Sequence, residues 1–301
     1  MIHPNFKEYL PSYYFSTINT HAAYPKLEGR LKTETCVIGG GLTGLCTALP
    51  LAENGREVTV LEAARIGFGA SGRSGGQVIS DYACGMEEIE KQVGLEQARW
   101  FWQQSLQAVE LVDERVKKYQ IACDWQRGYA TVAIRPQHWE ELQQWHEHAR
   151  QHYGATHYQL WDKATLKQQL ASDMYLGAQF DPHSGHLHPL NYTLGIARAA
   201  AEAGAQIFEQ SPMTRIESYQ GNWLVHTPDG SIECQNLVYA VNTYAGLHQK
   251  FKPLEKKAIA VSTFIIATEP LGERAKELIR NNMAVCDNRH VLDYYRLSAD
   301  G

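Results

Sequence analysis

The sequence predicts a discontinuous two-domain α/β protein with a parallel sheet in its first domain. Its 301 residues suffice for two domains at about 150 residues each. A strand, a glycine turn, a helix and a second strand follow one another within residues 35–62, and such a βαβ unit belongs in a parallel sheet. The strand expected at 237–241 extends this sheet. Segments around 123–134 and after 259 are typical of strands in a second domain inserted into the first.

Composition excludes several classes of protein. Hydrophobic residues make up 44% and charged residues 20%, which is typical of a globular chain and not of a disordered one. The net charge of −5 offers no basic field for the phosphates of a nucleic acid. The six cysteines form no C-x-x-C pair and no leader opens the chain, so we expect reduced thiols and a cytoplasmic location. No apolar run approaches the roughly 20 residues of a transmembrane helix.

The other elements follow from periodicity and from turn residues. Residues 1–32 show no period and are expected to form an arm packed onto a domain. Pro189 in the first turn and Gly204 at the end mark a helix over 189–204. Further helices are expected at 86–120, from Pro136 onward, at 163–171 and at 273–281. Further strands are expected as a pair within 123–134 and at 206–209, 213–219, 223–227, 259–268 and 291–297, with Asp229-Gly230 as a hairpin turn.

A glycine motif directly follows the first strand. Gly39 to Gly44 match G-x-G-x-x-G, in which the first glycine permits the tight turn, the second lets the backbone approach a pyrophosphate, and the third lets helix and strand pack closely. Glu62 follows Gly44 by 18 residues, at the end of the second strand, where a carboxylate can accept hydrogen bonds from an adenosine ribose. This acid would repel a 2′-phosphate, so the motif favours FAD or NAD over NADP. The alternative is an ordinary glycine-rich turn.

A second glycine-rich loop, residues 65–77, favours FAD over NAD. A nicotinamide enzyme has little need of such a loop after its ribose acid, whereas a flavin protein needs backbone close to a longer, buried cofactor. Arg73, Ser71 and Ser74 are candidates for contact with phosphate or ribityl oxygens, and Gln77 for contact with the isoalloxazine edge. The alternative is a mobile surface loop.

Five segments together carry a resemblance to a known family. They are Val37–Gly44, Val60–Ala63, Gly67–Gln77, Gly185–Pro189 and Leu292–Leu297. The sequence resembles the FAD-dependent amine and amino-acid oxidases of the D-amino-acid oxidase class, and within it the members that oxidise gamma-glutamylputrescine. The resemblance implies a Rossmann-like FAD-binding domain with an inserted, mainly antiparallel substrate domain. It also implies oxidative deamination of a small-molecule amine, with molecular oxygen reoxidising the flavin and releasing hydrogen peroxide.

The motif and the resemblance together define the expected domains and cofactor contacts. The arm is 1–32, the FAD-binding domain is 33–120 with 172–250, and the substrate domain is 121–171 with 251–301 and is expected to be incomplete at its C-terminal end. The expected FAD contacts are Gly39, Gly41, Leu42, Thr43, Gly44, Glu62, Ala63, Arg65, Ser71, Gly72, Arg73, Ser74, Gly76, Gln77, Met213, Ala240 and Asn242.

The substrate site is less defined by the sequence. Tyr294 and Arg296 share one face of the last expected strand, where Arg296 is placed to pair with a substrate carboxylate. A structural ion pair with an acid such as Asp293 is the alternative. His183, His186 and His188 are interpreted as a loop cluster and not as a metal site, because no convincing further ligand completes a zinc set.

Two other functions remain open at this point. One is a truncated, inactive copy that binds FAD poorly or not at all. It is suggested by Pro50 inside the cofactor helix, by Ser74 where the family usually has asparagine, and by the expected C-terminal incompleteness. The other is an NAD-dependent dehydrogenase.

Overall fold

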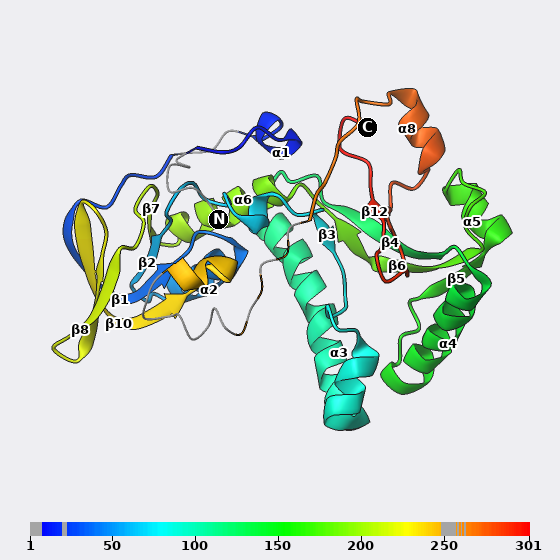
Figure 1. Ribbon diagram of the computed structural model, residues 1–301, viewed down its shortest axis with the longest axis horizontal. Coiled ribbons are helices and arrows are strands. Elements are labelled where there is room, and N and C mark those ends of the chain that lie inside the picture. Colours follow the sequence, from blue (N-terminus) through cyan, green and yellow to red (C-terminus); the bar gives the residue numbers. More distant parts are fainter. Residues whose placement is uncertain (1–7, 20–22, 248–256, 258, 260, 262) are drawn as a thin grey trace. The chain divides into compact units, whose positions relative to one another are not determined.

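The computed structural model of the chain divides into two compact units (Figure 1), and each is described by itself. The structure describes residues 8–19, 23–247, 257, 259, 261 and 263–301. Unit 1 comprises Met1–Ser74, Ile121–Cys123 and Pro189–Ile266, and unit 2 comprises Gly75–Gln120, Asp124–His188 and Ala267–Gly301.

Unit 1 is built on a six-stranded sheet with the order β7-β2-β1-β10-β9-β8. Its strands are β1 (Gly29–Ile38), β2 (Val58–Leu61), β7 (Gln206–Phe208), β8 (Arg215–Tyr219), β9 (Asn222–His226) and β10 (Gly230–Tyr239). Its helices are α1 (Tyr13–Ser16), α2 (Leu42–Glu53), η1 (Ala70–Gly72), α6 (Pro189–Glu202) and η2 (Asn242–Leu247). Strands β7, β2, β1 and β10 run parallel, whereas β9 pairs antiparallel with both β10 and β8. Helix α2 packs against α6, β1 and β2.

The predicted βαβ unit is confirmed. The apolar run that ends β1 is buried and contributes Cys36 and Ile38 to a core cluster with Leu61, Val225 and Ile232. The predicted hairpin between β9 and β10 is also confirmed, with the Thr227 amide donating to the Gly230 carbonyl at 2.9 Å. Pro50 lies in the last turn of α2, which ends three residues later.

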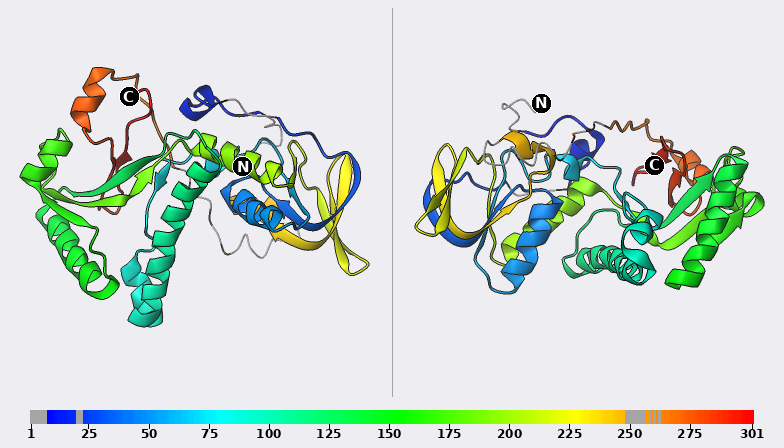
Figure 2. Two further views of the ribbon diagram at one scale, coloured as in Figure 1. Left: turned by 180° about the vertical axis from the view of Figure 1, so that it is seen from behind. Right: turned by 60° about the horizontal axis from the view of Figure 1, so that its bottom comes forward.

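Unit 2 contains a second six-stranded sheet, mainly antiparallel, with the path β12-β11-β4-β6-β3 and with β5 paired to β6. Its strands are β3 (Gln77–Val78), β4 (Gln126–Ala133), β5 (Gln159–Asp162), β6 (Gly177–His186), β11 (Ala284–Asp287) and β12 (Tyr294–Tyr295). Its helices are α3 (Met86–Lys118), α4 (Pro136–Tyr153), α5 (Lys163–Gln169) and α8 (Glu273–Leu278). The long helix α3, cyan in Figure 2, is interrupted at Gly94, where φ is +78°.

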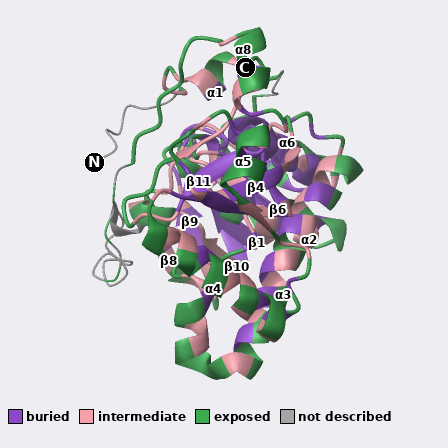
Figure 3. Ribbon diagram, turned by 90° about the vertical axis from the view of Figure 1, so that its right-hand side faces the viewer, coloured by how far each residue is buried: buried purple, intermediate pink, exposed green. Residues whose placement is uncertain are grey.

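Burial is concentrated in the central strands, as the purple segments of Figure 3 show. In unit 2 the core gathers Val132, Ala178 and Val285 from three neighbouring strands together with Leu166 and Met283. Among the helices of the described part of the chain, none combines the length and the apolar character that crossing a membrane requires.

Several predicted elements differ from the structure. The strand pair expected within 123–134 is the single strand β4, whose antiparallel partner is β6, and β6 contains His183 and His186 of the segment interpreted as a histidine loop. Of the strand expected at 259–268, residues 259, 261 and 263–268 form no strand, and 260 and 262 lie outside the described residues. The last strand covers Tyr294–Tyr295 alone, and β10 begins at Gly230 instead of 237.

The compact units also have boundaries unlike those expected. Residues 75–120, expected with the FAD-binding domain, belong to unit 2, and so do 172–188. The chain leaves unit 1 within the glycine-rich loop, after Ser74, because β3 at the end of that loop pairs with β6 in the second sheet.

Candidate functional site

The turn between β1 and α2 requires glycine at its first and last motif positions. Gly39 has φ of +112°, and a Cβ there would lie 2.3 Å from the Ala240 carbonyl oxygen. A Cβ on Gly44 would lie 2.0 Å from the Gly39 carbonyl oxygen, and one on Gly41 would lie 2.8 Å from the Ser71 hydroxyl. Absence of side chains therefore leaves bare backbone at the start of α2, which is the cradle that a pyrophosphate requires.

A hydroxyl oxygen already lies at the start of α2. The Ser71 Oγ accepts a hydrogen bond from the Leu42 amide at 2.9 Å. Thr43, the next residue, is exposed. The Leu42 amide therefore binds an oxygen acceptor in the protein itself, and amides at a helix start are the donors that a phosphate oxygen would use.

The Glu62 carboxylate lies against the same glycine turn. It follows β2 directly, and its two oxygens accept hydrogen bonds from the Gly40 amide at 2.7 Å and the Ala64 amide at 2.8 Å. Burial raises the pKa of this carboxyl, and the two amide donors partly oppose that rise. Ala63 is exposed beside it. The carboxylate is therefore anchored at the turn where an adenosine ribose would lie.

A pH dependence follows from the raised pKa of Glu62. An ordinary glutamate has a pKa of about 4.3, and the raised pKa means that Glu62 becomes protonated at a higher pH than this. We therefore expect FAD affinity to begin to fall above that pH as the solution is acidified, because the protonated carboxyl is a weaker acceptor for ribose hydroxyls. Stability without cofactor should change in the opposite sense: a raised carboxyl pKa favours the folded state at low pH, and this contribution is lost as pH rises through the folded pKa. FAD titrations and unfolding curves at several pH values measure both effects. Glu62→Gln should remove both pH dependences, and their persistence in that variant would contradict the assignment.

The other expected contacts in the second glycine loop lie partly in unit 1 and partly in unit 2. In unit 1, a Cβ on Gly72 would lie 2.3 Å from the Gly67 carbonyl oxygen, so this turn is as close as the one at Gly39. Arg73 and Ser74 are exposed, and the Arg73 guanidinium lies 5.6 Å from the centre of the Phe68 ring. Gly76 and Gln77 belong to unit 2, where Gln77 Nε2 donates to the Val285 carbonyl at 3.4 Å.

Three expected contacts lie in other segments of unit 1, outside its strands. Ala240 directly follows β10, and its amide donates to the Ile38 carbonyl at 2.8 Å. Asn242 begins η2 with φ of +50°. Met213 packs against the core cluster that includes Ile38. Gly39, Glu62 and Ala240 thus follow the carboxyl ends of three adjacent parallel strands, the edge where open α/β sheets bind ligands.

Both candidate substrate residues contact the second glycine loop within unit 2. Arg296 donates through Nε to the Gly75 carbonyl at 2.8 Å and through Nη2 to the Leu187 carbonyl at 3.0 Å. A Cβ on Gly75 would lie 2.6 Å from Cε2 of Tyr294. In the structure, these two side chains therefore support the start of the Gly75–Gln77 segment.

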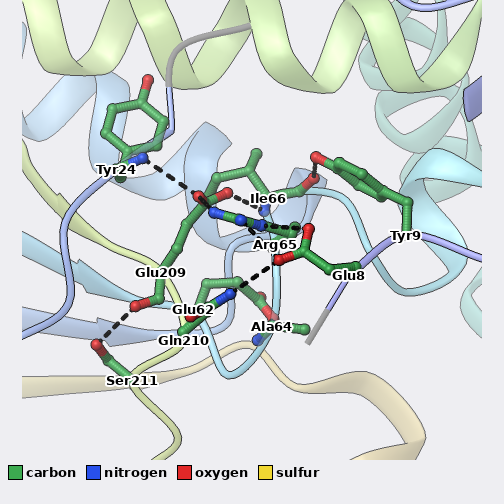
Figure 4. A network of polar contacts seen from close by, with 10 residues as sticks. All are labelled: Glu8, Tyr9, Tyr24, Glu62, Ala64, Arg65, Ile66, Glu209, Gln210 and Ser211. Carbon is green, nitrogen blue, oxygen red and sulfur yellow. Dashed lines mark hydrogen bonds and ion pairs between the residues drawn. The ribbon is translucent and has the colours of Figure 1, made fainter. Parts of the chain in front are cut away.

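Sequence reasoning missed one further acidic residue, Glu209, shown in Figure 4. Glu209 follows β7, its side chain is 1% exposed, and it pairs with Arg65 at 2.9 Å. The pairing occupies an arginine that we expected at the cofactor. The one available signal was position, because Glu209 and Glu62 are both acids that directly follow a parallel strand.

The strand, glycine turn, helix and anchored carboxylate of unit 1 define a dinucleotide-binding protein. Comparison with known proteins identifies the class further. Residues 34–301 match the family described as DAO, FAD dependent oxidoreductase, and the chain belongs to this family. The predicted resemblance, fold class and use of FAD are thereby confirmed, and the protein is an oxidoreductase of the amine and amino-acid oxidase type.

Two bacterial oxidoreductases are similar to this chain in sequence. The chain is 45% identical over 303 residues to the "Probable oxidoreductase OrdL" of Haemophilus influenzae, covering 100% of this chain and 70% of that protein. It is 39% identical over 295 residues to the gamma-glutamylputrescine oxidoreductase of Escherichia coli, covering 97% and 68%. Among solved structures, L-proline dehydrogenase from P. horikoshii is similar in fold, with a TM-score of 0.68 at 22% identity, covering 91% of this chain and 69% of that one.

Proposed function

We propose that this protein oxidises the carbon–nitrogen bond of a primary amine, with gamma-glutamylputrescine as its substrate. The products are an aldehyde, ammonia and hydrogen peroxide. The observation that carries the proposal is the Glu62 carboxylate, bonded at 2.7 Å to the Gly40 amide of the glycine turn in a member of an FAD-dependent oxidoreductase family. The choice of substrate rests on the 39% identity to an enzyme named for gamma-glutamylputrescine.

The residues of unit 1 fit the adenosine diphosphate portion of FAD. Glu62 would accept hydrogen bonds from the ribose hydroxyls, and the bare backbone of Gly39, Gly41 and Gly44 would admit the pyrophosphate to the amides that open α2. Bound FAD would supply the two-electron oxidation of the carbon that bears the amine, with molecular oxygen as the final electron acceptor. Water hydrolyses the imine that remains. The proposal includes a cytoplasmic location, which the free thiol state of all six cysteines supports.

Purification of the protein tests this proposal. We expect a yellow protein, or a colourless one that binds added FAD, and release of peroxide in proportion to gamma-glutamylputrescine consumed. Putrescine, sarcosine and D-alanine serve as comparison substrates under the same conditions. Peroxide from one of these but none from gamma-glutamylputrescine would remove the substrate assignment and leave the oxidase class. A protein that neither carries nor takes up flavin would support the inactive alternative, and turnover with NAD alone would support a dehydrogenase.

A further inference from the structure

Glu209 is a buried residue outside the glycine motifs, and its carboxylate accepts hydrogen bonds from three donors (Figure 4). Its Oε1 accepts from the Ile66 amide at 2.7 Å. Its Oε2 accepts from Arg65 Nη1 at 2.9 Å and from the Tyr24 amide at 3.2 Å. Two of these donors belong to the segment that follows Glu62, and the third belongs to the N-terminal arm.

The backbone around Glu209 is bonded to the same segment. The Glu62 amide donates to the Phe208 carbonyl at 2.8 Å, the Gln210 amide to the Ala64 carbonyl at 2.9 Å, and the Ser211 amide to the Glu62 carbonyl at 2.9 Å. Residues 208–211 and 62–66 are therefore tied together at each end and through the Glu209 side chain. The Ala64 amide, which orients the Glu62 carboxylate, lies in the middle of this arrangement.

The N-terminal arm holds the same segment from its other side. The Tyr9 hydroxyl donates to the Ile66 carbonyl at 2.7 Å, and the Arg65 guanidinium also pairs with Glu8 at 2.7 Å. The Glu209 amide donates to the Pro25 carbonyl at 3.0 Å. The Arg65 charge offsets that of Glu209, so the buried carboxylate is both paired and hydrogen-bonded, as burial of a charge requires.

We propose that Glu209 is a positioning residue for the cofactor. It holds residues 62–66 so that the Glu62 carboxylate stays at the Gly40 amide, where the ribose hydroxyls of FAD bind. The inference rests on the proposed ribose contact of Glu62. Glu209 itself acts through Glu62 and has no contact with the nucleotide.

The test compares ADP with 2′-deoxy-ADP, because loss of one ribose hydroxyl reports on Glu62 alone. Both nucleotides are titrated against the FAD-free protein by calorimetry. The wild-type protein should prefer ADP by about tenfold or more, as expected for a hydrogen bond to a charged group. Glu209→Gln places an amide donor opposite the donors of Arg65 or Ile66, displaces the segment and should bring this preference close to one.

Glu233→Gln is the matched control. Glu233 is also buried in unit 1 and pairs with Arg30 and Lys32 at 3.0 Å each, but these residues lie at the amino end of β1, away from the glycine turn. This variant should keep the wild-type preference for ADP even if its unfolding temperature falls. Should Glu209→Gln fail to fold, Glu209→Asp retains the charge, loses reach and should lower the preference in part.

The outcomes separate this inference from the proposal on which it rests. If the wild-type protein binds ADP and 2′-deoxy-ADP equally well, Glu62 does not bind the ribose, and the inference about Glu209 is wrong as well. A wild-type preference of tenfold that Glu209→Gln or Glu209→Asp leaves unchanged, with lowered stability, shows Glu209 to be merely structural and overturns the inference while the cofactor site stands.

Discussion

Gly39→Ala is expected to weaken FAD binding by roughly two orders of magnitude and to destabilise the fold by roughly 2–6 kcal/mol. The added Cβ would lie 2.3 Å from the oxygen and 2.9 Å from the carbon of the Ala240 carbonyl, both backbone atoms that cannot rotate away. The φ of +112° adds the strain of a conformation that alanine rarely adopts. Relief requires the turn to move by about 1 Å, which displaces the amides that would meet the pyrophosphate. Denaturant unfolding and FAD titration measure the two effects.

Substitutions at two other glycines distinguish the steric contact from the strained φ as causes of the weaker FAD binding and lower stability. Gly44→Ala introduces a contact of 2.0 Å with the Gly39 carbonyl oxygen without a positive φ, so it should reproduce the collision alone. Gly55→Ala has φ of +71° in open space beyond the end of α2, so it should cost about 1–2 kcal/mol and leave FAD affinity unchanged. Equal effects of Gly39→Ala and Gly55→Ala would show that the close approach at Ala240 is unimportant.

The strand, glycine turn and helix at the start of unit 1 could be predicted because the sequence patterns that indicate them are local. The strand, turn and helix are adjacent in the sequence, and the spacing from Gly44 to Glu62 reflects one helix and one short strand. A need for glycine was predicted at 39 from the tight turn and at 44 from the close packing of helix and strand, and the structure places carbonyl oxygens within 2.3 Å of where their Cβ atoms would be. Local turn residues likewise identified α6, through Pro189 and Gly204, and the β9–β10 hairpin, through Asp229-Gly230.

The sheet of unit 2 could not be predicted in the same way. Strand β4 pairs with β6, whose paired residues lie about 45–60 positions further along the chain, and no short-range pattern encodes that partner. Gly185, His186 and nearby polar residues made β6 resemble a loop. In the structure, a Cβ on Gly185 would lie 2.1 Å from the Gln126 carbonyl oxygen, so this glycine permits the close approach of two strands and does not mark a turn.

The protein partners of charged side chains could not be predicted from the sequence either. Arg65 was expected at the cofactor, but its guanidinium pairs with Glu8 and Glu209, residues 57 positions before and 144 after it. A sequence shows which groups are charged, whereas the partner of each depends on long-range packing. The same applies to Arg296, for which a substrate carboxylate and an acidic side chain were both considered and the structure presents backbone carbonyls.

Arg296→Lys is expected to destabilise the cofactor-free protein by about 2–4 kcal/mol, because one planar guanidinium joins two separate chain segments. Its Nε and Nη2 donate to the carbonyls of Gly75 and Leu187, and the Leu187 amide in turn donates to the Gly76 carbonyl at 2.8 Å. A lysine carries its charge at one point and does not span both carbonyls. Unfolding curves measure the loss, and amide exchange at Leu187 should accelerate.

Arg280→Lys is the matched control, since Arg280 also donates to two backbone carbonyls, those of Lys167 and Gln168, but is exposed. Its replacement should change stability by no more than about 0.5 kcal/mol. For Arg296, binding of a substrate carboxylate and support of the backbone carbonyls predict opposite results. A residue that holds a substrate carboxylate would raise KM when replaced and leave the stability of the substrate-free protein unaltered. If Arg296→Lys behaves in that way, the carbonyl contacts contribute little, and the substrate role is the one to retain.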